Sequence, residues 1–171
     1  PKILTTYEKM KEERNITLTL SKAREWYQKG GELKEVALQA YSEEELIKIE
    51  LPKPDLVIRQ REQDLKPGDV PITPYFGFID FHKITRDKGG IFFFYNEKNE
   101  LLFVGKARKI RQRIKKHFED NVSPMKNHRN EIFKIEVYEI EDPMEREIYE
   151  TYAINTFKAK YNVDKVFFER E

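Results

Sequence analysis

The fold of this chain is decided by the stretch Gly90-Ile91-Phe92-Phe93-Phe94-Tyr95-Asn96-Glu97-Lys98-Asn99-Glu100-Leu101-Leu102-Phe103-Val104-Gly105. Two aromatic and β-branched runs, residues 91–95 and 101–104, flank five polar residues of the kind that make a hairpin turn. The stretch therefore predicts a β-hairpin.

A strongly basic segment follows this hairpin. Seven Lys or Arg and no Asp or Glu lie between Lys106 and Lys116, whereas the whole chain carries 32 basic and 31 acidic side chains. Ile110, Ile114 and Phe118 recur every four residues, so a helix here would turn one apolar stripe toward the hairpin and leave its cations around the rest. Positive charge gathered at one place indicates an anionic partner.

The C-terminal sequence predicts one more strand and one more helix. Residues 133–140 form an apolar and aromatic run typical of a strand. The segment Asp142-Pro143-Met144-Glu145 combines an N-cap residue, a proline at the first helical position and an early acidic residue, so it predicts a helix that runs to about Lys158. With a helical turn after Pro124, the order β-β-α-(α)-β-α indicates an α/β (α+β) fold: a small three-stranded, mainly antiparallel sheet flanked by helices.

The first 50 residues are predicted to be mainly helical. Apolar stripes and capping residues indicate helices at about 21–30, 33–40 and 42–49. Three short helices are compatible with a helix-turn-helix, but any small helical bundle produces the same stripes, and residues 20–50 lack a basic recognition helix. The alternative is a helical module for packing or for binding a protein partner.

Prolines and glycine between residues 51 and 74 indicate a connector. We therefore expect an N-terminal helical module at 1–70, a Pro-rich connector to about residue 74, and a second domain at 75–171. Within the connector region, Leu56-Val57-Ile58 suggests a short strand. Residues 76–84 are compatible with either an edge strand or an apolar arm.

Composition excludes several classes of site. The chain has no Cys, which rules out disulfides, thiolate zinc sites and cysteine nucleophiles, and leaves oxygen and imidazole as metal ligands. His82, His117 and His128 lie far apart in sequence, which argues against a poly-histidine site. No apolar stretch approaches the roughly 20 residues of a membrane span, so a soluble cytoplasmic protein without a membrane partner is expected.

The hairpin also carries a familiar motif. Gly90-Ile91-Phe92, ten intervening residues and Phe103-Val104-Gly105-Lys106-Ala107-Arg108 resemble the GIY-YIG nuclease family, and especially the nuclease domain of the bacterial excision-repair incision subunit. The likeness continues through Arg113 and His117 on the first predicted helix, Glu150 on the last one, and Tyr161-Asn162 twelve residues beyond that glutamate. It covers residues 88–164.

The resemblance implies a hydrolase, an endonuclease that cleaves DNA phosphodiester bonds with one divalent cation, Mg²⁺ or Mn²⁺. Glu150 would be the metal ligand, because Mg²⁺ prefers oxygen donors and is commonly held by few carboxylates together with water and phosphate. Arg113 would bind the scissile phosphate through its fixed fork of donors. Asn162 would hold the end of the catalytic helix or the phosphate by hydrogen bonding.

Each of these residues also has a plainer interpretation. Taken alone, Glu150 would be a solvated helical residue paired with Arg146 one turn earlier. Arg113 would be one cation of a basic face, and Asn162 an ordinary turn residue. The remaining cations of the segment would bind the flanking DNA backbone: Lys106, Arg108, Lys109, Arg111, Lys115 and Lys116.

Both signature tyrosines of the family are phenylalanines here, Phe92 and Phe103. The family resemblance implies that the missing hydroxyls help to activate or orient water, and general-base help is worth about 3 to 5 kcal/mol of barrier. Tyr95 should point to the opposite face of its strand. His117 lies four residues after Arg113 on one helix face, and an unperturbed imidazole titrates near about pH 6.5, so we expect His117 to take or relay the proton. A surface histidine is the alternative.

The leading functional prediction is a metal-dependent DNA endonuclease of DNA repair, in excision-repair-like incision, or of mobile-element processing. A second interpretation keeps the fold without catalysis, as a weak or inactive DNA-binding module. A third makes the N-terminal helices the DNA reader of a regulator.

Overall fold

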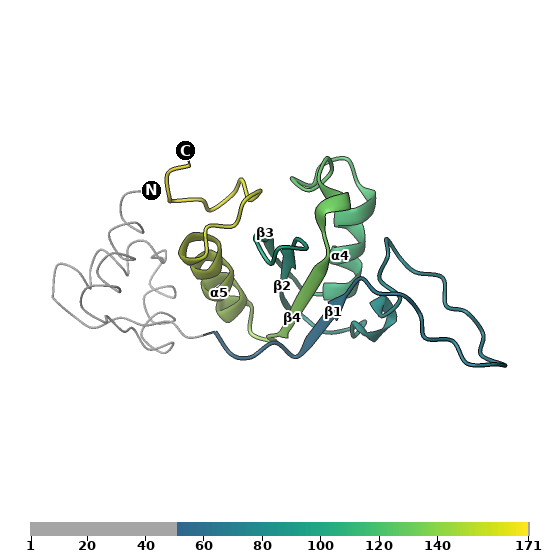
Figure 1. Ribbon diagram of the computed structural model, residues 1–171. Helices are drawn as coiled ribbons and strands as arrows, with labels where there is room; N and C mark the ends of the chain where they lie inside the picture. Colours follow the sequence, from purple (N-terminus) through teal and green to yellow (C-terminus); the bar gives the residue numbers. More distant parts are fainter. Residues whose placement is uncertain (1–50, 171) are drawn as a thin grey trace, which may run out of the picture.

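The computed structural model describes residues 51–170, which form a four-stranded antiparallel sheet with one helix on each face (Figure 1). The spatial order of the strands is β1-β4-β2-β3. The strands are β1 (Leu56–Arg59), β2 (Gly90–Tyr95), β3 (Leu101–Ala107) and β4 (Lys134–Glu139), and the helices are α4 (Ile110–Glu119) and α5 (Pro143–Thr156). The helices predicted before residue 50, and with them the helix-turn-helix, lie outside the described residues.

The sheet has four strands, not the three predicted. β1 is the additional strand, and it pairs antiparallel with β4, with Leu56 opposite Val137 and Arg59 opposite Lys134. The predicted strand at Leu56-Val57-Ile58 is thus confirmed, but it belongs to the sheet rather than to a connector alone. Prolines flank this strand without interrupting its ladder, which is why it can pair at the edge of a sheet. The domain division near residue 70 stays a prediction.

The hairpin of β2 and β3 is confirmed. In its turn, Asn96 Oδ1 accepts the backbone N–H groups of Lys98 at 3.0 Å and of Glu100 at 2.8 Å. Asn99 adopts a φ of +63°, a left-handed conformation that asparagine tolerates better than most residues. These local bonds set the register in which the two strands pair.

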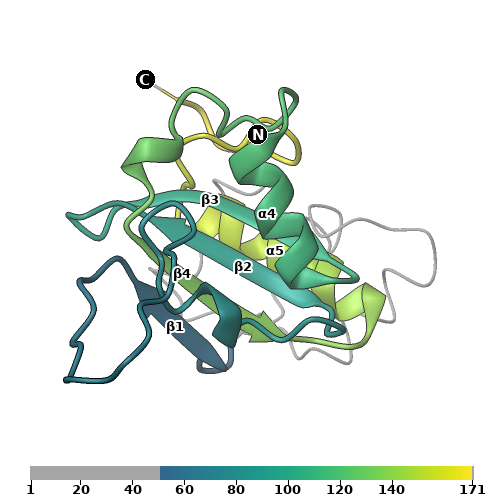
Figure 2. The ribbon, with the colours of Figure 1, turned by 90° about the vertical axis from the view of Figure 1, so that its right-hand side faces the viewer.

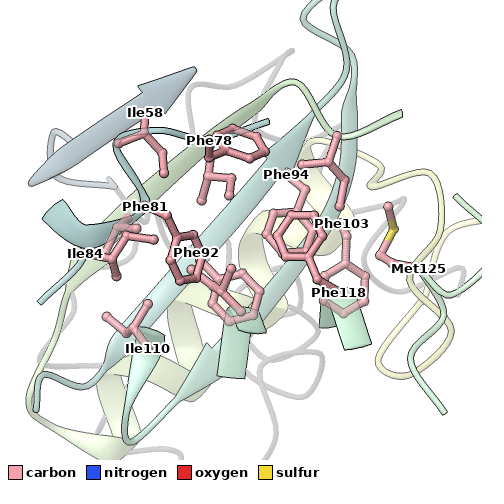
Figure 3. Packing of buried hydrophobic residues seen from close by; sticks show 14 of the residues in the cluster. Ile58, Phe78, Phe81, Ile84, Phe92, Phe94, Phe103, Ile110, Phe118 and Met125 are labelled. Atoms are coloured by element: carbon pink, nitrogen blue, oxygen red, sulfur yellow. The ribbon is translucent and has the colours of Figure 1, made fainter. Parts of the chain in front are cut away.

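Helix α4 covers a face of the sheet that is rich in phenylalanine. Ile110, Ile114 and Phe118 are all 1% exposed or less, as their spacing predicts. They pack with Phe92 and neighbouring rings into a single cluster (Figure 3). Residues 76–84 complete this layer as an irregular apolar segment with one 3₁₀ turn, η1 (Phe81–Lys83), and not as the edge strand that was one of the two alternatives predicted for them.

Helix α5 covers the other face of the sheet (Figure 2). It begins as predicted: Asp142 accepts the N–H of Met144 at 2.9 Å, and Pro143 occupies the first turn. Ala153 and Ile154 pack on the side chains that β2 and β3 turn to this face. The predicted turn after Pro124 is followed by a second 3₁₀ turn, η2 (Arg129–Glu131). Within residues 51–170, no helix is long and apolar enough to cross a membrane.

Candidate active site

Side chains from both helices line one pocket beside β3. This strand ends the spatial order of the sheet, so side chains from both faces can reach past it. The pocket measures about 360 Å³. It is lined by Phe103, Gly105 and Lys106 of β3, Arg113, Lys116 and His117 of α4, Glu150 of α5, and Asn162 and Lys165 of the C-terminal segment. All four predicted catalytic residues therefore line a single pocket, although α4 and α5 lie on opposite faces of the sheet (Figure 1).

The motif glycines allow the hairpin to pack closely. A Cβ on Gly105 would lie 2.3 Å from Cζ of Phe92, and one on Gly90 would lie 1.8 Å from the backbone oxygen of Tyr138. Both separations are far below van der Waals contact. A side chain at Gly90 would therefore push β2 away from β4, and one at Gly105 would displace the ring of Phe92.

Glu150 is buried and paired. The residue is 7% exposed, and its Oε1 accepts a hydrogen bond from Nζ of Lys165 at 2.7 Å. Burial raises the pKa of Glu150 above its ordinary value, and the ion pair with Lys165 opposes part of that rise. Arg146 donates instead to the carbonyl oxygens of Ile140 and Glu141. The solvated Glu150 with an Arg146 partner is therefore not what the structure shows.

A second carboxylate shares the same ammonium. Lys165 Nζ also donates to Oε2 of Glu147 at 2.6 Å, and Lys106 bonds that same oxygen. Burial works to raise the pKa of Glu147, but the hydrogen bonds from Lys106 and Lys165 outweigh it and hold this pKa below its usual value. Neither Glu147 nor Lys165 was predicted from the sequence as a site residue. Glu147 could have been found from its position one helical turn before Glu150.

Arg113 is one of the exposed cations of the pocket. Within residues 51–170 its guanidinium takes part in no hydrogen bond or ion pair, and the same holds for the ammonium of Lys116. Lys106, by contrast, is bound to Glu147. Arg113 and Lys116 are thus the pocket's available donors for an anionic group.

The other predicted DNA-binding cations differ in their surroundings. Arg108 and Lys109 are exposed at the start of α4, and Lys115 lies over the ring of Tyr75, 5.7 Å from its centroid. Arg111 donates through Nε to the carbonyl oxygen of Ile84, and another of its nitrogens bonds a second carbonyl of that loop. These two bonds hold the loop. Arg111 therefore has fewer free donors for DNA than the other cations predicted to bind it.

His117 sits among phenylalanine rings. Its ring centroid lies 4.8 Å from that of Phe103, 5.5 Å from Phe92 and 5.9 Å from Phe94, and its Nδ1 is 2.6 Å from Oγ of Ser123. Desolvation lowers the pKa of His117 to about 4. It is therefore neither the surface histidine nor the ordinary imidazole considered from the sequence.

Comparison with known proteins decides the family. Residues 88–162 match the family model of the GIY-YIG catalytic domain. The chain belongs to the GIY-YIG family. The uncharacterized protein YurQ of Bacillus subtilis is 64% identical over 124 residues, which are 72% of this chain and 100% of YurQ.

Other relatives match a smaller part of the chain. UvrABC system protein C of Pseudoalteromonas atlantica is 28% identical over 85 residues, 48% of this chain and 14% of that protein. A solved neighbour is the GIY-YIG N-terminal endonuclease domain of UvrC from Thermotoga maritima, a point mutant bound to the catalytic divalent cation. It has a TM-score of 0.44 and 22% identity, and the match covers 49% of this chain and 96% of that domain.

The two phenylalanines of this GIY-YIG domain differ in their access to the pocket. Phe92 is 0% exposed and Phe103 is 7% exposed, and of the two only Phe103 lines the pocket. Tyr95 points to the other face, as predicted, where its hydroxyl donates to Glu136 at 3.0 Å. The hydroxyls that the family motif supplies are therefore not replaced by this tyrosine.

Asn162 binds the edge strand of the GIY-YIG domain. Its Oδ1 accepts the N–H of Val104 and its Nδ2 donates to the carbonyl oxygen of Val104, both at 2.9 Å, in a site where Asn162 is 6% exposed. The side chain thus bonds to β3 rather than to the end of α5. This arrangement positions the C-terminal segment, including Lys165, beside the pocket.

Proposed function

We propose that this GIY-YIG domain cleaves DNA as a divalent-cation-dependent endonuclease. The observation that carries the proposal is that Arg113 and Glu150 line one pocket although their helices cover opposite faces of the sheet. A guanidinium binds phosphate oxygens and a buried carboxylate binds a cation, and metal-assisted phosphodiester hydrolysis can use both. A protein that only bound the DNA backbone would have little need for the carboxylate.

The donor set at Glu150 fits a divalent cation such as Mg²⁺ or Mn²⁺. This carboxylate already contacts one cation, the ammonium of Lys165. Within residues 51–170 no group of three or more His, Cys, Asp or Glu side chains could hold a metal, so water and substrate oxygens would complete the coordination, as is common for Mg²⁺. Once bound, such a cation lowers the pKa of water and withdraws charge from the phosphoryl group.

The chain's own side chains would place the phosphate and the water. Arg113 would bind the phosphate oxygens and stabilise the charge that develops on them. Ser123 Oγ accepts the N–H of Met125 at 3.0 Å and has a second lone pair for Nδ1–H of His117. In that tautomer Nε2 of His117 is an acceptor. Because the pKa of His117 is about 4, its imidazole holds a proton only weakly near neutral pH. We therefore assign it the role of orienting water by hydrogen bonding.

The exposed cations on and beside α4 would hold the flanking DNA backbone. Arg108, Lys109 and Lys116 are the most accessible of them. Two settings suit such an enzyme, namely incision in DNA repair and processing of mobile elements. Residues 1–70 would select the DNA or recruit a protein partner.

The test is cleavage of supercoiled and branched DNA with Mg²⁺ or Mn²⁺. We expect metal-dependent nicking that Glu150→Gln reduces by on the order of 100-fold or more, because the change removes the charged ligand. Glu141→Gln, an exposed carboxylate just before α5, is the matched control and should retain the rate. Thermal melts show whether both variants are folded. Nicking that survives Glu150→Gln would contradict the proposal.

A second function, DNA binding without cleavage, is favoured by one observation. Phe92 and Phe103 lack hydroxyls, and the depressed pKa of His117 weakens the remaining base. The same assay separates the two functions. Salt-sensitive DNA binding by the wild-type chain, with no nicking in either metal, would identify a binder.

A further inference from the structure

Lys165 is bound where a catalytic cation would have to bind. Its ammonium lies 2.7 Å from Oε1 of Glu150 and 2.6 Å from Oε2 of Glu147, and it lines the same pocket as Arg113. We propose that Lys165 is an internal counter-cation: it neutralises Glu150 in the resting protein and leaves this carboxylate when a divalent cation binds.

The backbone places Lys165 there at a conformational cost. Its φ is +61°, in the left-handed region that lysine seldom adopts. Asn155, which is 1% exposed, fixes this turn by donating to the carbonyl oxygen of Lys165 at 2.8 Å and accepting the N–H of Phe167 at 2.6 Å. A buried amide thus holds a strained residue with its ammonium against the two carboxylates.

The pair of carboxylates allows an exchange. A divalent cation on Glu150 and an ammonium on the same oxygen would repel each other at close range, in surroundings of low polarity. Glu147 offers Lys165 a second partner, so the ammonium can leave Glu150 and remain paired. The arrangement keeps Glu150 charged and neutralised before the metal arrives, because an unpaired buried carboxylate would be costly.

This inference rests on the proposed function, and its test therefore measures metal binding rather than cleavage. Mn²⁺ binding to the full chain is followed by the EPR signal of the free ion, and Glu150→Gln defines which part of the binding belongs to this site. Lys165→Asn removes the ammonium and keeps a residue that tolerates positive φ. We expect it to bind Mn²⁺ on the order of tenfold tighter than the wild-type chain, because a charge-assisted hydrogen bond no longer competes. Lys165→Gln is the second variant, should the first fold poorly.

Two controls isolate the cause. Lys158→Asn makes the same change at an exposed lysine outside the pocket that also has a positive φ, 53°, and it should leave the Mn²⁺ affinity unchanged. Lys106→Met removes a neighbouring positive charge that contacts Glu147 but not Glu150. It should tighten binding by less than the Lys165 variants do.

The outcomes separate this inference from the proposed function. Binding that requires Glu150 and tightens selectively in the Lys165 variants supports it. Equal affinities in the Lys165 and Lys158 variants, or equal tightening by Lys106→Met, overturns it while leaving the metal site intact. If no Mn²⁺ binding depends on Glu150 in any variant, the proposed metal site and this inference both fail.

Discussion

Helices α4 and α5 cover opposite faces of one sheet, yet they bury different kinds of side chain. The buried residues of α4 are Ile110, Ile114 and Phe118, whereas those of α5 include Arg146, Glu150, Thr151 and Asn155. Apolar burial stabilises a fold without directional requirements, but a buried charge destabilises it unless it is paired. Apolar packing therefore dominates on the α4 face, whereas the α5 face combines apolar packing with the carboxylate of Glu150, the proposed metal ligand, whose surroundings must remain paired.

The largest expected loss of folding stability comes from a substitution on the α4 face. Phe118→Ala should lower the free energy of unfolding by about 3 to 5 kcal/mol, because it leaves a cavity among packed rings. Phe118 is 1% exposed and lies 4.7 Å from the ring centroid of Phe76 and 6.0 Å from that of Phe94. Urea unfolding measures the change.

Phe157→Ala is the control from the opposite face. Phe157 ends α5 and is 50% exposed, so its loss should cost about 1 kcal/mol or less. Similar losses in the two variants would show that burial of the Phe118 ring does not set the size of its loss.

A slightly smaller change in folding stability is expected when His117, a polar residue on the α4 face, is protonated. Above pH 6.5 its imidazole is neutral in both the folded and the unfolded chain. Below that, the unfolded chain binds the proton first, because desolvation holds the folded pKa at about 4. The free energy of unfolding should therefore fall by about 3 kcal/mol between pH 6.5 and 4 through this group alone.

The measurement compares urea unfolding of the wild-type chain and of His117→Gln across this pH range. Glutamine can keep a hydrogen bond to Ser123 but does not titrate. The charged groups that act on His117, namely Asp120, Arg113 and Arg129, are present in both chains, so the difference reports His117. Parallel pH curves would show that the imidazole is not desolvated as described.

Asn162 tests how much buried polar contacts contribute to stability. Asn162→Ala should cost about 2 to 3 kcal/mol, because it leaves the N–H and carbonyl oxygen of Val104 without partners in a buried site. It should also lower the nicking rate, because Asn162 bonds the C-terminal segment to β3, the strand that carries Phe103 and Lys106 of the pocket. Chemical unfolding and nicking rates report the two effects. Asn127→Ala, at an exposed asparagine, should change neither, and an equally mild Asn162→Ala would remove the positioning role.

Most of the fold was predictable because its signals are local. The spacing of Ile110, Ile114 and Phe118 predicted which side of α4 is buried, and the cap at Asp142 predicted where α5 begins. The fourth strand was not placed in the sheet, because β1 pairs with β4, far along the chain. Nothing in four residues among prolines specifies such a non-local partner.

The candidate site divides in a similar way. Arg113 and Glu150 were found through the family motif, and the structure places both at one pocket. The pKa of His117 was not predictable, because the rings around it come from β2 and β3. Lys165 was missed because its contact with Glu150 depends on the path of the chain after α5. Motif letters identify candidate roles, whereas tertiary packing sets the charge and pairing of the groups.

The smallest expected effect is a change in nicking rate at Phe103, the ring of the aromatic face under α4 that lines the pocket. Phe103→Tyr should raise the nicking rate by about tenfold, or about 1.4 kcal/mol, because a hydroxyl on a pocket-lining ring can orient water. Phe92→Tyr is the matched comparison: that ring is 0% exposed, packs on Gly105 and does not line the pocket, so its hydroxyl should give no gain. Single-turnover nicking of supercoiled DNA measures both rates. An equal gain from Phe92→Tyr would mean that solvent reaches beneath Phe103, and the aromatic face would then be part of the reaction site rather than only its support.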